Sequence, residues 1–434
     1  MILHPHFDVN EQGHLTIGGA DALALANTFG TPAYILDETV IRENCRAYLH
    51  AAKTHFGADA LPLYASKALS FTGIYRIVAE EGLGIDCVSG GELYTAQNAR
   101  FPAERIYFHG NNKTDADLCQ ALEMGVGTIV VDGDEELEAL HALASARGLA
   151  QKILLRITPG IDPHTHRAVV TGNVDSKFGN AIATGQALAI TKKALSLSGV
   201  RLAGFHCHIG SQIFEIDPFR DAAHMMLRFI ADVKAATGFE ATELNLGGGL
   251  GVRYTEEDRE IDYAAAIAAI AEIVRAGARS AGIAMPRVIL EPGRSLVAAA
   301  GATLYTVGSV KEIPGFRNYV SVDGGMPDNP RYALYQSRYT ALIADRAGEK
   351  KDYIATVAGR CCESGDLIGE GMPLQKPRRG DILAVLCTGA YNYSMASNYN
   401  RLPRPPVILV RDGKARVAVR RETFADLVDL DITE

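Results

Sequence analysis

Residues capable of covalent chemistry and anion binding follow several short apolar runs of this 434-residue chain. Ser66-Lys67 comes directly after the apolar run Leu61–Ala65. An amine at the end of a buried strand is costly unless it is paired, neutral or used covalently. Taken alone, Lys67 also fits a solvated loop lysine, so its meaning depends on the residues around it.

Two further motifs contain histidine and glycine. His206-Cys-His208 places two imidazoles on one face of a strand, because alternate strand residues share a face. Such a pair could bind a metal ion, but no third or fourth ligand with convincing spacing accompanies it. The run LGGGLG (246–251) lets backbone amides approach an anion closely. It does not follow the first strand of the fold, where a dinucleotide-binding motif would lie. A packed core histidine and a plain turn are the alternatives.

The elements that position these motifs alternate between strand and helix signals. Each strand signal is a short apolar run, too short for a typical helix, and segments with helical spacing lie between the runs. The eight runs are Leu61–Ala65, Gly84–Val88, Arg105–His109, Thr128–Asp132, Lys152–Ile157, Leu202–His208, Thr242–Leu246 and Arg287–Glu291. Alternation implies parallel strands, and eight such units favour a closed (β/α)8 TIM-type barrel over a doubly wound open sheet.

After about Leu296 the pattern changes to strands without long helices between them. These strands are expected at Tyr305–Val310, Tyr319–Asp323, Tyr353–Val357, Ile382–Leu386 and Val407–Val410. Asp412-Gly413 is a strong hairpin-turn signal, and HLTIGG (14–19) reads as a lone strand outside the barrel. We therefore predict a barrel over 36–297 and a β-sandwich or β-barrel-like domain built from 1–35 and 298–434.

The carboxyl ends of barrel strands carry the chemistry, and the last two loops commonly hold a phosphate. Glycines on both loops, with Ser211 and Arg294, predict such a phosphate site. Pyridoxal 5'-phosphate needs a phosphate site, a lysine for its Schiff base and an acid that keeps its pyridine nitrogen protonated. Lys67 and Glu291 supply the last two groups, and a ring-sized histidine faces the same cavity.

Composition narrows the alternatives. The chain has 43 Lys and Arg against 51 Asp and Glu, a net charge of -8, which argues against a general nucleic-acid binder. No signal peptide and no uninterrupted apolar stretch of membrane-spanning length is evident, so we expect no membrane span. The seven cysteines are irregularly spaced without a CxxC motif, which favours a reducing cytoplasm over a disulfide framework.

The motifs taken in order resemble those of a known family over nearly the whole chain. They are YASKALS (64–70), GIDCVSGGEL (84–93), DSKFGN (175–180), FHCHIGSQI (205–213), LNLGGGLG (244–251), EPGRSLV (291–297), VDGGMPDNPRYALY (322–335), CESGD (362–366) and GAYNYSMASNYN (389–400). The chain thereby resembles the fold-type III pyridoxal-phosphate decarboxylases, and among them the branch that acts on diaminopimelate. That family combines a barrel with a β domain, as expected above.

The resemblance implies a role for each matching residue. Lys67 would carry the cofactor, His208 would stack on its ring, and Glu291 would bind the pyridine nitrogen. The residues around the phosphate or its edge would be Ser211, Gly249, Gly293, Arg294 and Tyr391. Cys362 would donate a proton after CO2 leaves. The substrate's distal end would be recognised by Arg294, Arg331, Tyr335, Glu363 and Tyr391.

The implied activity is decarboxylation of meso-2,6-diaminopimelate to L-lysine and CO2, the last step of lysine biosynthesis, by a homodimer with shared active sites and no metal. One alternative is a sister decarboxylase of ornithine, lysine, arginine or carboxynorspermidine, which would not need an arginine pair. A non-enzymatic cofactor carrier would not need CESGD, and a metal-dependent hydrolase would rest on His206 and His208. Cys361 is a second candidate thiol. His206 reads as a core residue, and His109 could line the pocket.

Overall fold

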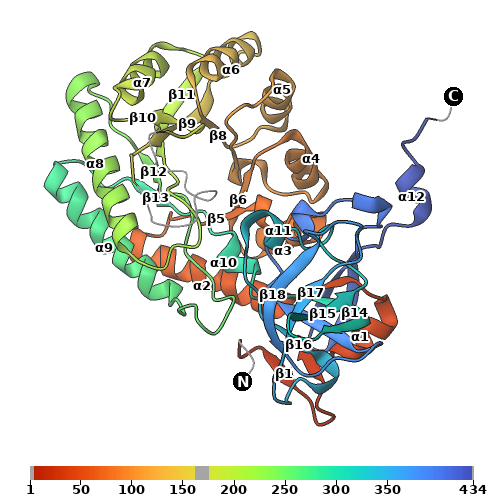
Figure 1. The fold of residues 1–434 in the computed structure, drawn as a ribbon. Helices are drawn as coiled ribbons and strands as arrows, with labels where there is room; N and C mark the ends of the chain where they lie inside the picture. The colour runs from red at the N-terminus through yellow and green to blue at the C-terminus, as the bar shows by residue number, and fades with distance from the viewer. Residues whose placement is uncertain (1–3, 162–174, 433–434) are drawn as a thin grey trace. The chain divides into compact units, whose positions relative to one another are not determined.

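The computed structural model describes residues 4–161 and 175–432. The chain forms two compact units, which are described separately (Figure 1). The barrel unit comprises Cys45–Gly251 and Ile261–Gly293. The β unit comprises Met1–Asn44, Val252–Glu260 and Arg294–Glu434. Val252–Glu260 thus lies within the sequence range of the barrel but belongs to the β unit. The limits 36–297, 1–35 and 298–434 stay a prediction.

The barrel unit contains eight parallel strands in one ring. In spatial order they are β13 (Arg287–Ile289), β12 (Glu243–Asn245), β11 (Val200–His206), β9 (Gln151–Thr158), β8 (Thr128–Val131), β7 (Ile106–Phe108), β6 (Gly84–Cys87) and β5 (Leu63–Ala65). Backbone hydrogen bonds from Leu63 N to Leu290 O (2.8 Å) and from Ala65 N to Pro292 O (3.0 Å) join the first strand to the last. The predicted barrel is therefore confirmed, and the open sheet is excluded. A short strand, β10 (Asn180–Ala181), pairs with β9.

Helices lie outside the strands of this ring (Figure 1). Their bounds are α3 (Thr72–Glu80), α4 (Gly90–Asn98), α5 (Asp115–Met124), α6 (Asp134–Ala146), α7 (Gln186–Ser196), α8 (Asp217–Thr237) and α9 (Tyr263–Ala281), while α2 (Glu38–Phe56) begins in the β unit. The spacing of apolar residues explains their packing: α9 buries Ile267, Ile270 and Val274 on one face. Helices are thus present in the segments with helical spacing that were expected between the apolar runs.

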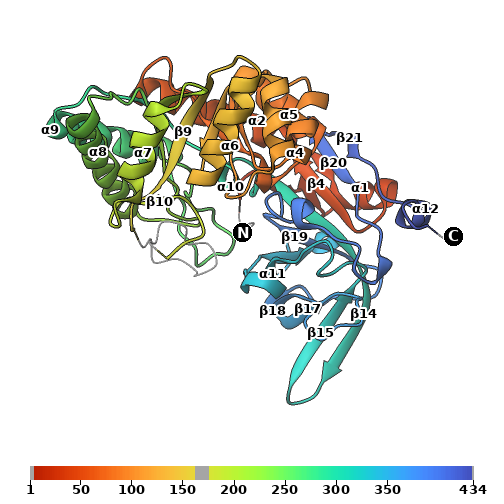
Figure 2. The same ribbon diagram turned by 90° about the horizontal axis from the view of Figure 1, so that it is seen from above.

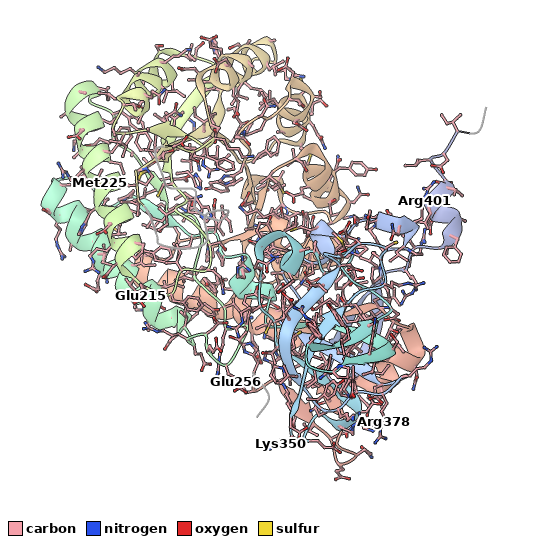
Figure 3. All side chains as sticks on the ribbon, in the orientation of Figure 1. Glu215, Met225, Glu256, Lys350, Arg378 and Arg401 are labelled. Carbon is pink, nitrogen blue, oxygen red and sulfur yellow. The ribbon has the colours of Figure 1, made fainter. Side chains whose placement is uncertain are left out.

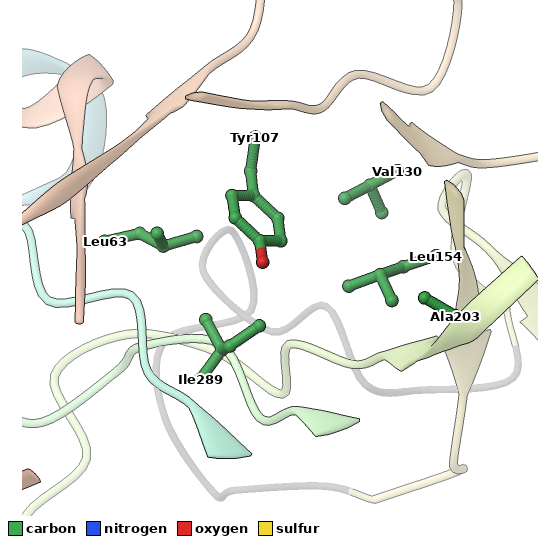
Figure 4. Close-up of a cluster of buried hydrophobic side chains, with 6 residues drawn as sticks. All are labelled: Leu63, Tyr107, Val130, Leu154, Ala203 and Ile289. Carbon is green, nitrogen blue, oxygen red and sulfur yellow. The ribbon is translucent and has the colours of Figure 1, made fainter. Parts of the chain in front are cut away.

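The barrel interior changes character along the strands. An apolar layer fills its centre, where six side chains point toward one another (Figure 4). They are Leu63, Tyr107, Val130, Leu154, Ala203 and Ile289. Two residues further along their strands, on the same face, the chain places His109, Arg156 and Glu291. The layer at the carboxyl ends is thus polar, and the apolar layer beneath it seals the barrel.

The β unit is built mainly on one mixed sheet. Its strands run in the order β18 (Leu367–Leu374), β17 (Tyr353–Ala358), β15 (Arg317–Val322), β14 (Gly301–Ile313), β4 (Ala33–Asp37), β20 (Val407–Arg411) and β21 (Lys414–Val419). Off this path, β19 (Ile382–Leu386) pairs with β14 and with β16 (Ala341–Ile343). Because β4 pairs with both β14 and β20, the N-terminal segment joins the C-terminal strands as predicted. Figure 2 shows β14 and β15 as a long antiparallel pair.

Local turns account for the edges of this unit. Asp412 (φ 52°) and Gly413 (φ 73°) form the predicted hairpin between β20 and β21. The strand expected to be alone, β2 (Leu15–Ile17), instead pairs with β1 (Phe7–Val9) and β3 (Ala20–Asp21). The short helices of this unit are α1 (Ala22–Phe29), α10 (Arg294–Val297), α11 (Arg331–Tyr335) and α12 (Phe424–Val428).

Charged side chains are exposed on the surfaces of both units. Glu256, Lys350 and Arg378 of the β unit are exposed, as is Glu215 of the barrel unit (Figure 3). Among the described helices, none combines the length and the apolar character that crossing a bilayer requires.

Candidate active site

Lys67 lies in a single 3-10 turn, Ser66–Ala68, directly after β5. Its side chain is exposed, and its charge acts on the carboxyls of Asp86 and Glu92. Burial raises the pKa of Asp86 and of Glu92, and the cation of Lys67 counters that effect. Lys67 therefore lies where the barrel's polar layer begins, beside acidic groups that favour a cation.

Gly293 allows the loop after β13 to lie against this turn. A Cβ atom at Gly293 would lie 2.9 Å from the Cβ of Ala65 and 3.2 Å from that of Ala68. Any larger residue would push the loop away from the turn that holds Lys67. The glycine of the EPGR motif thus has a packing reason within the barrel unit.

Glu291 is a buried carboxylate of the barrel interior with three polar side chains beside it. His109 Nε2 lies 2.8 Å from Oε1, and His206 Nε2 lies 3.3 Å from Oε2. Asn245 Nδ2 donates a hydrogen bond of 2.7 Å to Oε1. Burial opposes ionisation, yet the neighbouring His109 and His206 hold the pKa of Glu291 well below its ordinary value. Glu291 is therefore a carboxylate at neutral pH, although its side chain is only 6% exposed.

The same environment keeps His206 and His208 neutral. Desolvation lowers the pKa of His206 to about 4, although Glu291 acts in the opposite direction. The pKa of His208 lies well below its ordinary value because desolvation and the charge of Lys67 both disfavour the imidazolium. A neutral imidazole at His208 suits stacking on an aromatic ring.

The glycine run packs closely against the loop that follows β11. Ile213 N donates to Gly249 O (2.9 Å), and Gly251 N donates to Ile213 O (3.0 Å). A Cβ at Gly249 (φ 124°) would lie 2.6 Å from Gly210 O. The run must therefore be glycine for backbone to meet backbone here. Ser211 lies on the loop so held, and its side chain is half-buried.

Sequence reasoning missed Arg156, a buried cation of the same polar layer. Arg156 ends the apolar part of β9, and its guanidinium carbon lies 4.2 Å from the centre of the Phe178 ring. Asp132 is its acidic neighbour, at 3.8 Å. The charge of Arg156 acts on Glu291, Asp86 and His208. An arginine inside the apolar run KILLRI was the signal that could have revealed it.

The donor set of the barrel unit fits pyridoxal phosphate. One interior offers an amine at Lys67, a neutral imidazole at His208, a carboxylate at Glu291 and a glycine run whose backbone leaves no room for a Cβ. These are the groups that the cofactor's aldehyde, ring face, ring nitrogen and phosphate need. The predicted cofactor residues Lys67, His208, Ser211, Gly249, Glu291 and Gly293 all belong to this unit.

The same interior contains a cluster with metal-ligand types. Ligand atoms of His109, His206 and Glu291 lie within 4.8 Å of one another. This is not the His206–His208 pair on which the metal hypothesis rested. His109 and His206, interpreted as a pocket residue and a core residue, both face Glu291, with their ring centres 4.8 Å apart.

The β unit holds the predicted arginines over aromatic rings. Arg331 and Tyr335 are the two ends of α11, four residues apart, so they share a face. The Arg331 guanidinium carbon lies 4.3 Å from the centre of the Tyr335 ring and 5.1 Å from that of Tyr391. The corresponding carbon of Arg294 lies 4.7 Å from the Tyr391 ring centre. The ring of Tyr391 thus makes cation–π contacts with both guanidinium groups. The backbone of Tyr391 has an uncommon positive φ of 64°.

The two arginines differ in their partners. Arg294 Nη1 donates to the hydroxyl of Tyr254 at 2.8 Å. Arg331 is buried, with no ion pair to an acidic side chain in the described part of the chain, and its Nε has no hydrogen-bond partner there. Arg331 Nη1 donates to the sulfur of Met395 at 3.8 Å, a weak acceptor, so a carboxylate ligand would satisfy this buried guanidinium better. Tyr254 was missed because its segment, Val252–Glu260, reads as a barrel loop.

The CESGD loop is fixed at its base by Asp366. This buried carboxylate accepts hydrogen bonds from the amides of Cys361 (2.7 Å) and Met326. Cys362 is exposed, and its amide donates to Asn400 Oδ1 at 2.8 Å. Burial and the neighbouring Asp366 raise the pKa of Cys361 to about 12. Of the two thiols, Cys362 is the accessible one.

Glu363 lies on the same loop and is exposed. Its carboxylate accepts a hydrogen bond of 3.2 Å from Gly365 N. The β unit therefore contains Arg294, Arg331, Tyr335 and Tyr391 in one cluster, and Cys362 and Glu363 on another loop.

Comparison with known families gives one match that covers more than half of the chain. Residues 41–298 match the family described as pyridoxal-dependent decarboxylase, pyridoxal binding domain. The matched segment contains β5 to β13 and every residue of the barrel's polar layer.

Individual proteins resemble the chain over its full length. A diaminopimelate decarboxylase of Bacillus subtilis (strain 168) is 48% identical over 432 residues, covering 100% of this chain and 98% of the relative. A crystal structure of diaminopimelate decarboxylase from M. jannaschii in complex with L-lysine has a TM-score of 0.91 at 35% identity, covering 100% and 99% of the two chains. A lysine/ornithine decarboxylase from Vibrio vulnificus, complexed with cadaverine, reaches 0.74 at 25% identity, covering 89% and 97%.

Proposed function

Because the chain belongs to the pyridoxal-dependent decarboxylases, and within them to the diaminopimelate decarboxylases, we propose that it converts meso-diaminopimelate to L-lysine and CO2. The observation that carries the choice of substrate is Arg331. It is a buried guanidinium held over two aromatic rings, and it lacks an acidic partner among the described residues. A substrate with a second amino-carboxylate end supplies that partner.

Pyridoxal phosphate, when bound, withdraws the electron pair that remains on the substrate's α-carbon after CO2 leaves. Lys67 holds the cofactor, Glu291 keeps its ring nitrogen protonated, and His208 covers a ring face. Backbone amides of the glycine run and the side chain of Ser211 bind the phosphate, with Gly249, Gly293, Arg294 and Tyr391 around it. The low pKa of Glu291 supports its role, because only a carboxylate favours a charged pyridine nitrogen.

Cys362 delivers the proton that replaces the lost carboxylate. Its thiol is exposed on a loop whose base is fixed by Asp366, whereas the pKa of Cys361 is too high for ready proton exchange at neutral pH. Either thiol is chemically able to donate, so accessibility decides between them. Glu363, one residue further, is the acidic group suited to the distal ammonium.

Selectivity for one end of the substrate requires a second binding site for the other end. Arg331, with Arg294, Tyr335 and Tyr391, provides a cationic, aromatic-lined surface for the distal carboxylate. L-Lysine and L-ornithine have no distal carboxylate, so they cannot pair with this surface.

The decisive experiment is CO2 release from a panel of amino acids. Meso-diaminopimelate should be decarboxylated with a kcat/KM at least about tenfold above those of L-lysine, L-ornithine and L-arginine, since losing a charged hydrogen bond costs roughly 1.5–3 kcal/mol. The LL and DD stereoisomers test whether one stereocentre is selected. Comparable turnover of L-lysine or L-ornithine would overturn the assignment in favour of a sister decarboxylase.

The enzyme acts as a cytoplasmic homodimer in which Lys67 of one protomer works with Cys362 of its partner. The proposal rests on the domain organisation, because Lys67 belongs to the barrel unit and Cys362 to the β unit. In a two-fold dimer, loops exchanged between protomers create two identical sites. The absence of disulfides among the described cysteines agrees with a reducing compartment.

Mixing two inactive variants tests this sharing. Lys67→Ala and Cys362→Ala are combined under conditions of subunit exchange, and tags verify that mixed dimers form. Each mixed dimer then carries one site with both defects and one with neither, so about one quarter of the parental activity returns. Mixed dimers at the mutant background would place both residues in one chain.

A further inference from the structure

Asn245, at the end of β12, joins the two parts of the barrel that the proposed cofactor site requires. It is fully buried, and its side chain makes two hydrogen bonds. Nδ2 donates to Glu291 Oε1 (2.7 Å), and Oδ1 accepts from Gly247 N (2.9 Å). A carboxylate can only accept and an amide N–H can only donate, so these partners fix the orientation of the Asn245 amide.

These bonds close a small ring between the ends of β12 and β13. Glu291 N donates to Gly247 O at 2.8 Å, so Gly247 is bonded both to Asn245 and to Glu291. The next residue, Gly248, has no room for a Cβ, which would lie 2.1 Å from Glu291 O. Hydrogen bonds of the backbone and of the Asn245 side chain therefore hold the glycine run against Glu291.

His109 and His206 complete the surroundings of the carboxylate. They approach its two oxygens from β7's end and from β11, while Asn245 approaches from β12. Side chains from the ends of three strands therefore converge on one carboxylate. The charged or titratable groups acting on Glu291 in the barrel unit also include Asp86, Arg156, Cys207 and His208.

We propose that Asn245 is a positioning residue that orients the Glu291 carboxylate toward the ring nitrogen of the cofactor and couples that orientation to the phosphate-binding glycine run. His109 and His206 act with it as positioning residues. This inference rests on the cofactor role assigned to Glu291, and it does not depend on which amino acid is the substrate.

Asn245→Asp separates this role from simple packing. The new side chain has nearly the same shape and keeps the acceptor for Gly247 N, but it places a second carboxylate beside Glu291. Two carboxylates this close cannot both stay ionised, so they share a proton. The negative charge on Glu291 is then reduced, so Glu291 stabilises the protonated ring nitrogen less well. Asn98→Asp, an exposed Asn-to-Asp change at the end of α4, is the matched control.

The first measurements need no substrate. Apoprotein is titrated with pyridoxal 5'-phosphate, and the visible absorbance of the bound cofactor is followed against pH. In Asn245→Asp we expect the pH midpoint of the absorbance change to move by about one unit or more and the Kd of the cofactor to rise at least about fivefold. Asn98→Asp should match the parent. If Asn245→Asp also matches the parent in both measurements, the proposal fails.

Turnover adds a second criterion. The kcat of Asn245→Asp should fall about tenfold or more while KM for meso-diaminopimelate changes less than about twofold, because the substrate's distal end is untouched. An altered KM with an unchanged kcat would contradict the proposal. If no amino acid in the panel is decarboxylated by the parent, the proposed substrate fails, whereas the absorbance and Kd still test Asn245.

His206 gives an independent pair in case Asn245→Asp does not fold, as judged by circular dichroism. His206→Gln keeps an N–H donor near Glu291 Oε2, and His206→Leu removes it. We expect the absorbance midpoint of His206→Gln to stay within about half a unit of the parent and that of His206→Leu to move. Equal behaviour of the two variants would overturn the positioning network.

Discussion

The two units each bury a carboxylate, but they surround it in opposite ways. In the barrel unit, Glu291 is approached by two imidazoles and an amide N–H, and its pKa lies well below the ordinary value. In the β unit, burial raises the pKa of Asp328 to about 7, although the Tyr305 hydroxyl and Gly325 N donate to it. Burial raises the pKa of both carboxyl groups, so the number and type of groups around each carboxylate decide whether its pKa ends above or below the ordinary value.

A related contrast separates the proposed cofactor residues of the barrel unit from the proposed substrate residues of the β unit. In the barrel unit, the carboxylate of Glu291 already has His109, His206 and Asn245 beside it, whereas Asp86 Oδ1 and His206 Nδ1 lack hydrogen-bond partners among the described residues. The β unit leaves Arg331 over aromatic rings without an acidic partner in the described chain. A substrate carboxylate that enters and leaves can pair with a cation that still lacks its anion.

The largest effect should come from the barrel side. Lys67→Ala removes the amine that holds the cofactor, and we expect turnover to fall to background and the visible absorbance of the bound cofactor to disappear. Asp86 and Glu92 also lose a neighbouring cation. Steady-state CO2 release and an absorbance scan measure both effects. Near-parental activity in this variant would remove Lys67 from the chemistry.

Arg331→Ala tests the substrate side. We expect kcat/KM for meso-diaminopimelate to fall at least roughly tenfold, because a charged hydrogen bond to a carboxylate contributes about 1.5–3 kcal/mol. The Kd for pyridoxal phosphate should stay within about twofold of the parent, since Arg331 belongs to the β unit's substrate surface. Arg338→Ala, an exposed arginine paired with Glu257, is the matched control. An unchanged kcat/KM would exclude Arg331 from recognition.

Much of the barrel side could be predicted from the sequence because strands have a period of two. Tyr107 and Ile289 belong to the apolar layer, so His109 and Glu291 two residues later had to face the same interior. Their convergence could not be predicted. It depends on barrel closure and on the bulge of β11 between Leu202 and Gly204, which together set the register of strands distant in sequence.

The β side was less predictable for physical reasons. β18 contains two glycines and a proline, and β16 has three residues, so neither carries a strong strand pattern. Tyr254 reaches Arg294 from a segment enclosed by barrel sequence. Cys362 and Arg331 were recognised through family motifs, because loop residues and a five-residue helix have no periodicity that reveals them.

A smaller effect is expected where the β side depends on a single carboxylate. Asp366 accepts the amides of Cys361 and Met326 with its two oxygens. Asp366→Asn leaves one amide without an acceptor, at a cost of about 1–3 kcal/mol, so the loop that carries Cys362 should loosen. We expect kcat to fall about fivefold or more and the alkylation rate of Cys362 by iodoacetamide to change.

Asp8→Asn, an exposed change in the same unit, is the control for that loop. Alkylated cysteine is assigned by peptide mass, so that Cys361 and Cys362 are distinguished. Parental kcat together with a parental alkylation rate at Cys362 would show that Asp366 does not position the thiol.

Thermal stability, measured without substrate, tests the two buried carboxylates Glu291 and Asp328 directly. The pKa of Asp328 is about 7 when folded and about 3.9 when unfolded, so the folded state binds the extra proton between these values. Stability from this residue is therefore present below about pH 4 and is lost as pH rises toward 7. Asp328→Asn removes the penalty, since the Tyr305 hydroxyl can accept from the new amide while Gly325 N still donates to its oxygen. Thermal unfolding of Asp328→Asn should show a raised midpoint at pH 8 and little change at pH 4.5, with a gain in stability on the order of 2–4 kcal/mol at the higher pH.

Glu291→Gln should have the opposite effect and lower the midpoint of thermal unfolding at pH 8, because the folded state stabilises the ionised form of Glu291. If both variants move the midpoint at pH 8 in the same direction, burial alone governs these carboxylates and the contrast between the two units is wrong.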